Sequence, residues 1–422
     1  MSLFGGVVSI SSISFLMFSV MIVAALGYLL GRITIKGVSL GTAGVFIVAL
    51  VFGAIFYGNV ESALVVTKDV SYSTQALKVI ENVGLILFVT AVGFIAGPNF
   101  FKNLKKNYKS YILLGVIIIL SGALACVGCY YVGVPFEDDP KEFVAMLDGI
   151  LSGALTTTPG FSAAKATVEN LYASDPAKME AYEAAVTVGH GIAYLFGVVG
   201  VVLFVQLIPK FAKANMDEER AKIMSVDMGE KKEYKGKLID IDPIGIAAFA
   251  LAAFIGIFVG CIKVPLSGQG LSGNTFSLTT TGGTLITALV FGHFAHFGPI
   301  NVTPNKKMLE VLRELGLMLF LIGAGIAGGA KFVEYFKLVY FVYGIVMTLV
   351  PMIVGYFFAK YVLKLSLLNS LGSITGGMTS TPALGTLISV AGTEEVASAY
   401  AATYPIALLA IVLVSQFLLV LL

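Results

Sequence analysis

Charged residues are scarce in this sequence, and tryptophan is missing altogether. Asp, Glu, Lys and Arg make up 12% of the 422 residues, whereas a soluble domain carries about 25%. Hydrophobic residues make up 57%. A water-soluble fold does not bury so large an apolar fraction, so lipid is expected to cover much of the surface. The composition therefore predicts an integral membrane protein and argues against an ordinary soluble enzyme.

Other scarce residues narrow the function further. The net charge is only +2, which gives no sign of a nucleic-acid partner. Cys126 and Cys129 form a CxxC in an apolar stretch, where packing is the better interpretation than redox chemistry. His293 and His296 have no acidic or thiolate residue close by in the sequence, so a metal site is not expected there. No nucleophile–base set or cofactor motif appears, so we expect no enzymatic activity and no cofactor other than a coupling Na⁺ or H⁺.

Long apolar runs recur from end to end, and each approaches the roughly 20 residues needed to cross a bilayer. No charged residue precedes Arg32, so the first run is expected to be a retained span and not a cleaved signal peptide. The runs lie at 12–30, 38–57, 83–98, 110–133, 184–208, 243–262, 308–329, 338–359 and 402–422.

The sequence is internally duplicated. ENVGLILFVTAVGFIAG at 81–97 returns as RELGLMLFLIGAGIAGG at 313–329, ALVFG at 49–53 returns at 288–292, and LTTTPGF at 155–161 returns as MTSTPAL at 378–384. Because the blocks keep their order, we predict a first membrane repeat over 1–209 and a second over 243–422. The polar, basic segment 210–242 links them.

Charge predicts how the repeats are oriented. Lys and Arg near span ends stay on the cytoplasmic side, which places the linker inside and the acidic loops around 137–139 and 169–183 outside. Segment 146–168 then enters and leaves by one face, so each repeat has about five spans and a re-entrant or broken helix. An odd span number inverts the second repeat, whose segment 366–391 re-enters from the cytoplasm. Lys331 and Lys337 do not fit this topology. The alternative is a parallel repeat of about twelve spans with the linker outside.

The duplicated TTTP and TSTP segments are the best candidates for a binding site. Proline favours the start of a helix and a preceding threonine favours its N-cap, so each segment predicts a chain break with a new helix from Pro159 or Pro382. Broken backbone inside a membrane faces protein or a polar cavity, and a helix N-terminus attracts anions. The alternative is that the hydroxyls only cap their own helices.

A second paired feature follows each break. His190 and Tyr194 align with Tyr400 and Tyr404, and an imidazole can bind an anion or carry a proton. The alternative for His190 is a hydrogen bond to a neighbouring carbonyl. Lys165 is a possible counter-charge, although a side chain reaching the outer surface is favoured. The predicted substrate-binding residues are Thr156, Thr157, Thr158, Pro159, His190, Tyr194, Thr379, Ser380, Thr381, Pro382, Tyr400 and Tyr404.

Acidic residues are absent from the predicted span centres. Asp148, Glu81 and Glu314 lie near predicted ends, which argues against a cation/proton antiporter.

These blocks resemble the aspartate:alanine exchanger family of bacterial membrane transporters. The resemblance rests on 84–101, GILSGALTTTPGF at 149–161, AYLFG at 193–197, 313–329, and GGMTSTPAL with the following AYAATYP. It implies an exchanger of acidic amino acids or dicarboxylates in the bacterial inner membrane. Family members commonly carry two soluble regulatory domains between the halves, and the short linker leaves no room for them here. His190 and Leu195 stand where the family's first-half motif has tyrosine and proline, whereas Tyr400 and Pro405 keep the motif in the second half.

The sequence thus predicts an all-α, multi-pass carrier of a small carboxylate such as aspartate or a C4-dicarboxylate. It would work by alternating access, in an elevator-like movement and as an exchanger, and a homodimer is compatible with such a scaffold. The alternatives are sodium- or proton-coupled symport of a similar anion and, in a different class, a passive anion channel.

Overall fold

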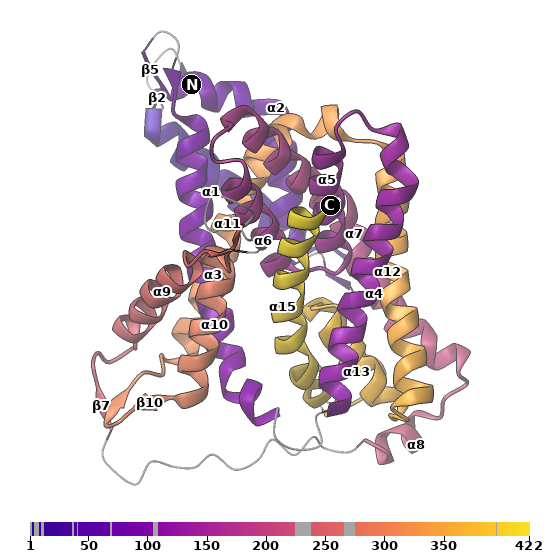
Figure 1. Cartoon of the computed structure of the whole chain (residues 1–422). Coiled ribbons are helices and arrows are strands. Elements are labelled where there is room, and N and C mark those ends of the chain that lie inside the picture. The colour runs from indigo at the N-terminus through magenta and orange to yellow at the C-terminus, as the bar shows by residue number, and fades with distance from the viewer. Residues whose placement is uncertain are drawn as a thin grey trace. The chain divides into compact units, whose positions relative to one another are not determined.

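The computed structural model of the chain describes residues 2–3, 8–9, 12–35, 38–39, 41–67, 70–103, 109–223, 238–265, 275–393 and 395–422. Helices dominate it (Figure 1). They are α1 Ser12–Gly31, α2 Ala43–Ala63, α3 Ser73–Asn103, α4 Lys109–Gly133, α5 Pro140–Ala154, α6 Thr158–Leu171, α7 Pro176–Phe211, α8 Met216–Ala221, α9 Ile246–Gly260, α10 Thr279–Phe294, α11 Lys306–Tyr335, α12 Leu338–Phe357, α13 Leu367–Gly377, α14 Thr381–Ala391 and α15 Val396–Leu421. A 3₁₀ turn at Val134–Phe136 follows α4, and a π-helical turn at Phe358–Val362 follows α12.

Strands are short and lie in the connections. Four antiparallel pairs form hairpins: β1 Ser2–Leu3 with β2 Val8–Ser9, β3 Thr34–Ile35 with β4 Val38–Ser39, β5 Val65–Thr67 with β6 Val70–Ser71, and β8 Val264–Pro265 with β9 Thr275–Phe276. β10 His296–Phe297 pairs with β11 Ile300–Asn301, and β7 Ile239–Asp240 joins β11 in parallel. The fold is therefore all-α, as expected.

Eight helices in the described part of the chain are long and apolar enough to cross a membrane: α1, α2, α3, α4, α7, α11, α12 with its π-helical end, and α15. The sequence predicted about ten spans. Among the described residues, α9 is a shorter apolar helix of 15 residues, and α10, the counterpart of α2, has 16 residues; both fall short of a full crossing by length. The two repeats differ here, because the counterparts of α9 and α10 in the first repeat, α1 and α2, have 20 and 21 residues.

Two compact units divide the chain, and both draw on the two sequence halves. The first contains 1–88 and 314–336, and the second contains 89–313 and 337–422. The first unit has a core of α1, α2, the first part of α3 and the second part of α11, with Val23, Val45, Leu77, Ile322 and Ile326 at its centre. The second unit contains both helical hairpins, α5–α6 and α13–α14.

Glycines at positions 93, 97, 325 and 329 let helices of different repeats pack closely. In the second unit, Gly93 lies against Ala288 and Gly97 against the Leu289 carbonyl. In the first unit, the repeat-related pair is Gly325 against Ala49 and Gly329 against the Leu50 carbonyl. None of these positions has room for a Cβ, so the duplicated glycines are packing residues.

The observed helix boundaries agree with some of the predicted segment boundaries and differ from others. The first hairpin begins at Pro140, earlier than the predicted 146, because Asp139 caps the helix by accepting from the Lys141 and Glu142 N–H groups. The second hairpin, 367–391, agrees with the predicted 366–391.

The linker begins with the end of α7 and includes α8. The basic residues Lys231, Lys232, Lys235 and Lys237 lie outside the described residues.

Candidate functional site

The first helix break lies between α5 and α6. Thr156 has a left-handed backbone, with φ 53°, and Thr157 is extended, with φ −103° and ψ 103°. The Thr157 Oγ1 accepts from the Gly160 N–H at 3.2 Å, which caps α6. Its own N–H donates back to the Ser152 carbonyl at 2.9 Å. The chain is therefore broken but its backbone groups at the break are bonded, as a buried break requires.

The second break, between α13 and α14, repeats this geometry. Thr379 has φ 52° and Ser380 is extended, with φ −93° and ψ 96°. The Ser380 N–H donates to the Thr375 carbonyl at 3.1 Å, the bond that matches Thr157 to Ser152. Two segments far apart in the sequence thus adopt one unusual local structure. Both have threonine first, threonine or serine second, and then threonine and proline.

Both helices begin one residue earlier than predicted. The sequence placed their first residues at Pro159 and Pro382, whereas α6 starts at Thr158 and α14 at Thr381. The prolines therefore occupy the second helical position, where a missing N–H costs nothing. The N-caps are correspondingly Thr157 and Ser380. The side chains of Thr381 and Pro382 lie outside the described residues.

The two breaks touch each other. The Thr156 Oγ1 donates to the Met378 carbonyl at 2.9 Å, and the Thr379 Oγ1 donates to the Leu155 carbonyl at 3.1 Å. A β-branched residue with a left-handed backbone is strained by about 1–3 kcal/mol. Each strained threonine donates its hydroxyl hydrogen bond to a carbonyl of the other repeat. The strain in one break is therefore offset by a bond to the other break. This reciprocal pair of bonds is the centre of the candidate site.

We call the break at the end of each hairpin its tip. The hydroxyls of Thr157 and Ser380, one at each tip, differ in their hydrogen bonding. Both Thr157 and Ser380 are fully buried. Thr157 caps its helix, as the structural alternative for these threonines required, whereas the Ser380 Oγ has no hydrogen-bond partner within the described part of the chain. A buried hydroxyl without a partner is costly. Ser380 is therefore the tip residue best placed to gain a bond from a bound ligand.

The His190 side chain contacts the side chain of a serine in the first hairpin, and not the backbone carbonyl that the alternative required. Its Nδ1 lies 2.8 Å from the Ser152 Oγ, and its ring stacks on Phe161 at 4.2 Å and on Tyr194 at 5.1 Å between centroids. Tyr400 and Tyr404 on α15 stack at the same 5.1 Å. The aligned aromatic pairs therefore have matching geometry on α7 and α15. His190 is completely buried, while the three tyrosines are partly exposed.

The charged residues near the hairpins are more deeply buried than the sequence predicts. Lys165 on α6 is 7% exposed, so the expected reach to the outer surface is wrong; the hairpin packing covers it. Asp148 was placed near a segment end, but it lies deep in α5 and is 1% exposed. Arg313, which the sequence analysis did not single out, lies close enough to Tyr404 for an electrostatic interaction. Only its position in the duplicated block at 313–329 pointed to it.

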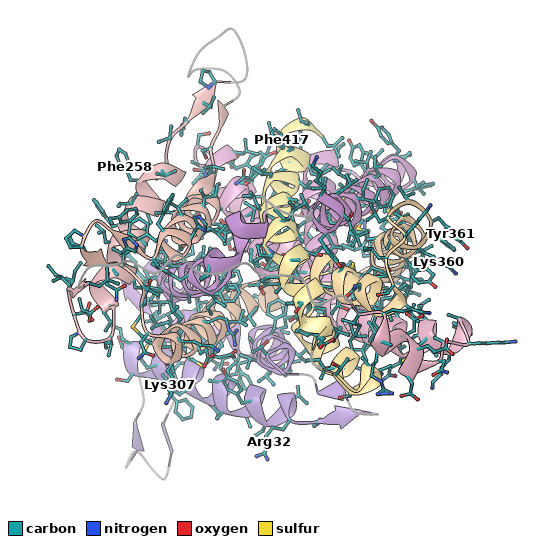
Figure 2. The ribbon with its side chains drawn as sticks, turned by 90° about the horizontal axis from the view of Figure 1, so that it is seen from below. Arg32, Phe258, Lys307, Lys360, Tyr361 and Phe417 are labelled. Carbon is teal, nitrogen blue, oxygen red and sulfur yellow. The ribbon has the colours of Figure 1, made fainter. Side chains whose placement is uncertain are left out.

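A cavity of about 580 Å³ lies where α12, α13 and the start of the linker meet. Lys222, Lys360 and Lys364 line it, together with the first residues of α13. Lys360 and its neighbour Tyr361 lie side by side in the π-helical turn that follows α12 (Figure 2). Glu219 of α8 accepts from the Leu367 N–H at 3.0 Å, so a carboxylate of the linker already occupies the N-terminus of α13.

A bundle of apolar helices with two broken hairpins meeting tip to tip has the architecture of a membrane transport protein. The family described as Predicted Permease Membrane Region, the permease region of the aspartate-alanine exchanger family, matches residues 19–210 and 248–420. The chain belongs to this family, and the resemblance seen in its motifs is confirmed.

Several relatives of the chain are described as transporters. An "Uncharacterized transporter" of Bacteroides thetaiotaomicron is 26% identical, with 94% of this chain and 97% of the relative covered. Transporters with the same description from Rhodopirellula baltica and Desulfotalea psychrophila are each 24% identical, with 97% and 96% of their length covered. The first alignment runs over 556 positions. Because this chain has 422 residues, that relative contains residues with no counterpart here. The protein is a multi-pass membrane transporter.

Proposed function

We propose that this transporter is a secondary active carrier of a small carboxylate, an acidic amino acid such as aspartate or a C4-dicarboxylate, that works by alternating access as an exchanger. The observation that carries the proposal is the reciprocal bonding of Thr156 and Thr379 across the two helix breaks. Carriers with internal repeats bind substrates at such paired breaks. The bacterial inner membrane is the proposed location.

The chemistry of the tips supports an anionic substrate. Two helix N-termini, α6 and α14, begin at the meeting point, and each carries partial positive charge. An ionised carboxylate has acceptor oxygens only, which suit the unbonded Ser380 hydroxyl and the hydroxyl donors of Thr156 and Thr379 once their contact opens. Arg313 beside Tyr404 and the buried Lys165 supply positive charge in the same unit.

The contact also supports an inverted repeat. Exchange of equivalent bonds, Thr156 to Met378 and Thr379 to Leu155, is the pattern produced by a local two-fold axis. In Figure 1 the α5 and α13 labels lie toward opposite ends of α15, and both helices pack against it. We therefore propose that the hairpins re-enter from opposite membrane faces, with the linker on the cytoplasmic side.

Transport requires the tips to separate. Thr157 and Ser380 are closed off from solvent in this conformation, and the cross-repeat bonds occupy two hydroxyl donors. A carboxylate would have to replace these bonds with its own. Alternating access then consists of opening the contact toward one face at a time.

The test is uptake of labelled aspartate and succinate into proteoliposomes preloaded with aspartate, alanine, succinate or buffer, with and without a sodium gradient. We expect saturable uptake that depends on an internal amino acid or dicarboxylate. Thr157→Leu and Ser380→Leu should abolish it while the purified protein stays monodisperse. Ser389→Leu is the matched control, because Ser389 is an exposed residue of α14 away from the tip.

The other outcomes separate the alternatives. Sodium-driven uptake into empty vesicles would replace exchange by symport, and flux that does not saturate would indicate a channel. Unchanged transport in both leucine variants would remove the tips from the binding site.

A further inference from the structure

Asp148 is an acid buried inside the helix bundle. It lies in α5, is 1% exposed, and its Oδ2 is 2.5 Å from the Ser415 Oγ of α15. Its Oδ1 is buried and has no hydrogen-bond partner among the described residues. An ionised carboxylate in such surroundings needs several donors, and a single hydroxyl does not replace water. Ionisable residues inside a membrane bundle usually serve function, as proton relays do.

Ser415 connects this acid to the candidate site. Its Oγ also lies 3.3 Å from the Gly160 carbonyl in the first turn of α6. A hydroxyl has one proton to donate and here faces two acceptors. When Asp148 is protonated, its O–H donates to Ser415, and Ser415 is free to donate to Gly160. When Asp148 is ionised, Ser415 must donate to it, and the Gly160 carbonyl loses this donor. The proton on Asp148 therefore changes a bond to the helix that begins at Thr157 and Thr158.

The repeat-related pair of positions shows that the fold does not need this polar pair. Aligning the two breaks pairs Asp148 with Leu371, and aligning VLFVQ at 202–206 with VLVSQ at 412–416 pairs Ser415 with Val205. Leu371 and Val205 are fully buried in one apolar cluster. Hydrophobic packing thus suffices at the equivalent place, so the Asp148 carboxyl of α5 and the Ser415 hydroxyl of α15 have a role beyond packing.

Few other titratable groups can take this role. Of the side chains on the helices packed against α5, the Cys126 thiol on α4 is near enough to Asp148 for an electrostatic interaction. His190 reaches α5 one turn further along, at Ser152. Lys165 and Glu183 are buried and have interaction partners of their own. Other titratable groups in contact with α5 or its cap are Tyr130 on α4 and Tyr340 and Tyr343 on α12, which pack on Phe143, and Tyr182 on α7, which donates to the Asp139 cap.

We propose that Asp148 is a proton-binding site coupled to transport, and that Ser415 relays its protonation state to the first turn of α6. The coupling rests on the proposed function, since the proton would move with the carboxylate in each cycle. The site takes H⁺ and not a metal ion, because the described residues place one carboxyl group and one hydroxyl together there and form no cluster of His, Cys, Asp or Glu that could hold a metal.

The experiment compares accumulation of labelled aspartate and succinate in proteoliposomes of the full chain that are preloaded with alanine as the counter-substrate, with and without an acid exterior. With one proton per cycle, accumulation at equilibrium rises about tenfold for each pH unit of gradient. Asp148→Asn should remove this response, and Ser415→Ala should keep it but shift the pH of half-maximal uptake. Asp148→Leu with Ser415→Val, which copies the other repeat, should also lose the response. Asp138→Asn is the matched control, because Asp138 is exposed and lies before the same helix.

Infrared difference spectra of the purified protein give a readout that does not depend on transport. A carbonyl stretch of a protonated carboxylic acid should disappear as the pH rises, and Asp148→Asn should lack it. If this infrared band is present but no carboxylate is transported, the proposed function is wrong and Asp148 is still a proton-binding site. A gradient response that persists in Asp148→Asn, a sodium gradient that replaces the proton gradient, or an unchanged infrared spectrum would each overturn the inference.

Discussion

Asp139 shows how one side chain fixes where a hairpin begins. Its carboxylate accepts from the Lys141 and Glu142 N–H groups at 2.9 and 3.2 Å and from the Tyr182 hydroxyl at 2.6 Å. It joins the start of α5 to α7, which packs along the same hairpin. Partial burial by itself raises the pKa of Asp139, but the Tyr182 hydrogen bond, the two N–H groups and the Lys178 charge together lower the pKa below its ordinary value.

Replacing Asp139 with alanine should destabilise the protein by about 1 kcal/mol, the usual cost of a lost N-cap. Because the folded pKa is lower than the unfolded one, this contribution is complete above the ordinary Asp pKa of about 3.9 and is lost as the pH falls through the lower folded value. Thermal unfolding in detergent at neutral and acid pH measures both. Asp139→Asn, which can still cap, should lose less at neutral pH, and equal losses in both variants would contradict the capping role.

At the scale of elements, each hairpin packs on a long helix through small residues. Gly149 and Gly153 of α5 lie against the Val186 and His190 carbonyls of α7. In the second repeat, the equivalent Gly372 and Gly376 of α13 lie against the Val396 and Tyr400 carbonyls of α15. The close approach brings each break beside its aromatic pair. Packing glycines, and not the threonines alone, therefore position the site.

Gly153→Ala and Gly376→Ala should each disrupt this packing, because a Cβ would meet backbone of the facing helix. Overpacking of this kind costs about 1–3 kcal/mol. We expect a lower unfolding temperature and lost uptake from either variant. Gly385→Ala is the control, since no heavy atom lies within 4 Å of a Cβ at that position. Equal stability of all three variants would show that the hairpins are not tightly packed on α7 and α15.

For the whole molecule, a contact between the repeats bears on topology. Lys337, which did not fit the predicted cytoplasmic side, donates to Glu137 at 2.5 Å, and Tyr340 donates to the other oxygen of Glu137 at 2.9 Å. The two positions must therefore lie on the same side of the membrane. If Glu137 is outside, as its acidic loop predicts, Lys337 is outside too, and its charge is paired with a carboxylate.

Single cysteines at Glu137 and Lys337 should be labelled from outside by an impermeant reagent in cells, and a cysteine at Lys222 only from inside. Cys261 must first be replaced because it is exposed, whereas Cys126 and Cys129 are buried. Labelling of Lys222→Cys from outside would favour the parallel repeat and remove the proposed inversion. Labelling of Glu137→Cys and Lys337→Cys from different sides would contradict the contact itself.

The sequence alone determined the class of protein, the duplication and the two helix breaks. These follow from local or additive properties: apolar length sets the spans, and threonine before proline sets a helix start. The family membership followed from the same motifs. The positions of Thr156, Thr157, Thr379 and Ser380 at the helix breaks were predicted in this way, although the helices start one residue earlier.

Only the tertiary structure decided which groups meet. That Thr156 bonds Met378, that His190 bonds Ser152, and that Asp148 lies buried beside Ser415 depend on contacts between segments separated by up to 267 residues. Periodicity and composition carry no information on such partners, because they describe one helix at a time. The division into two compact units, each taking helices from both repeats, has the same origin: helices pack with neighbours in space, and a duplicated chain can exchange them between its halves.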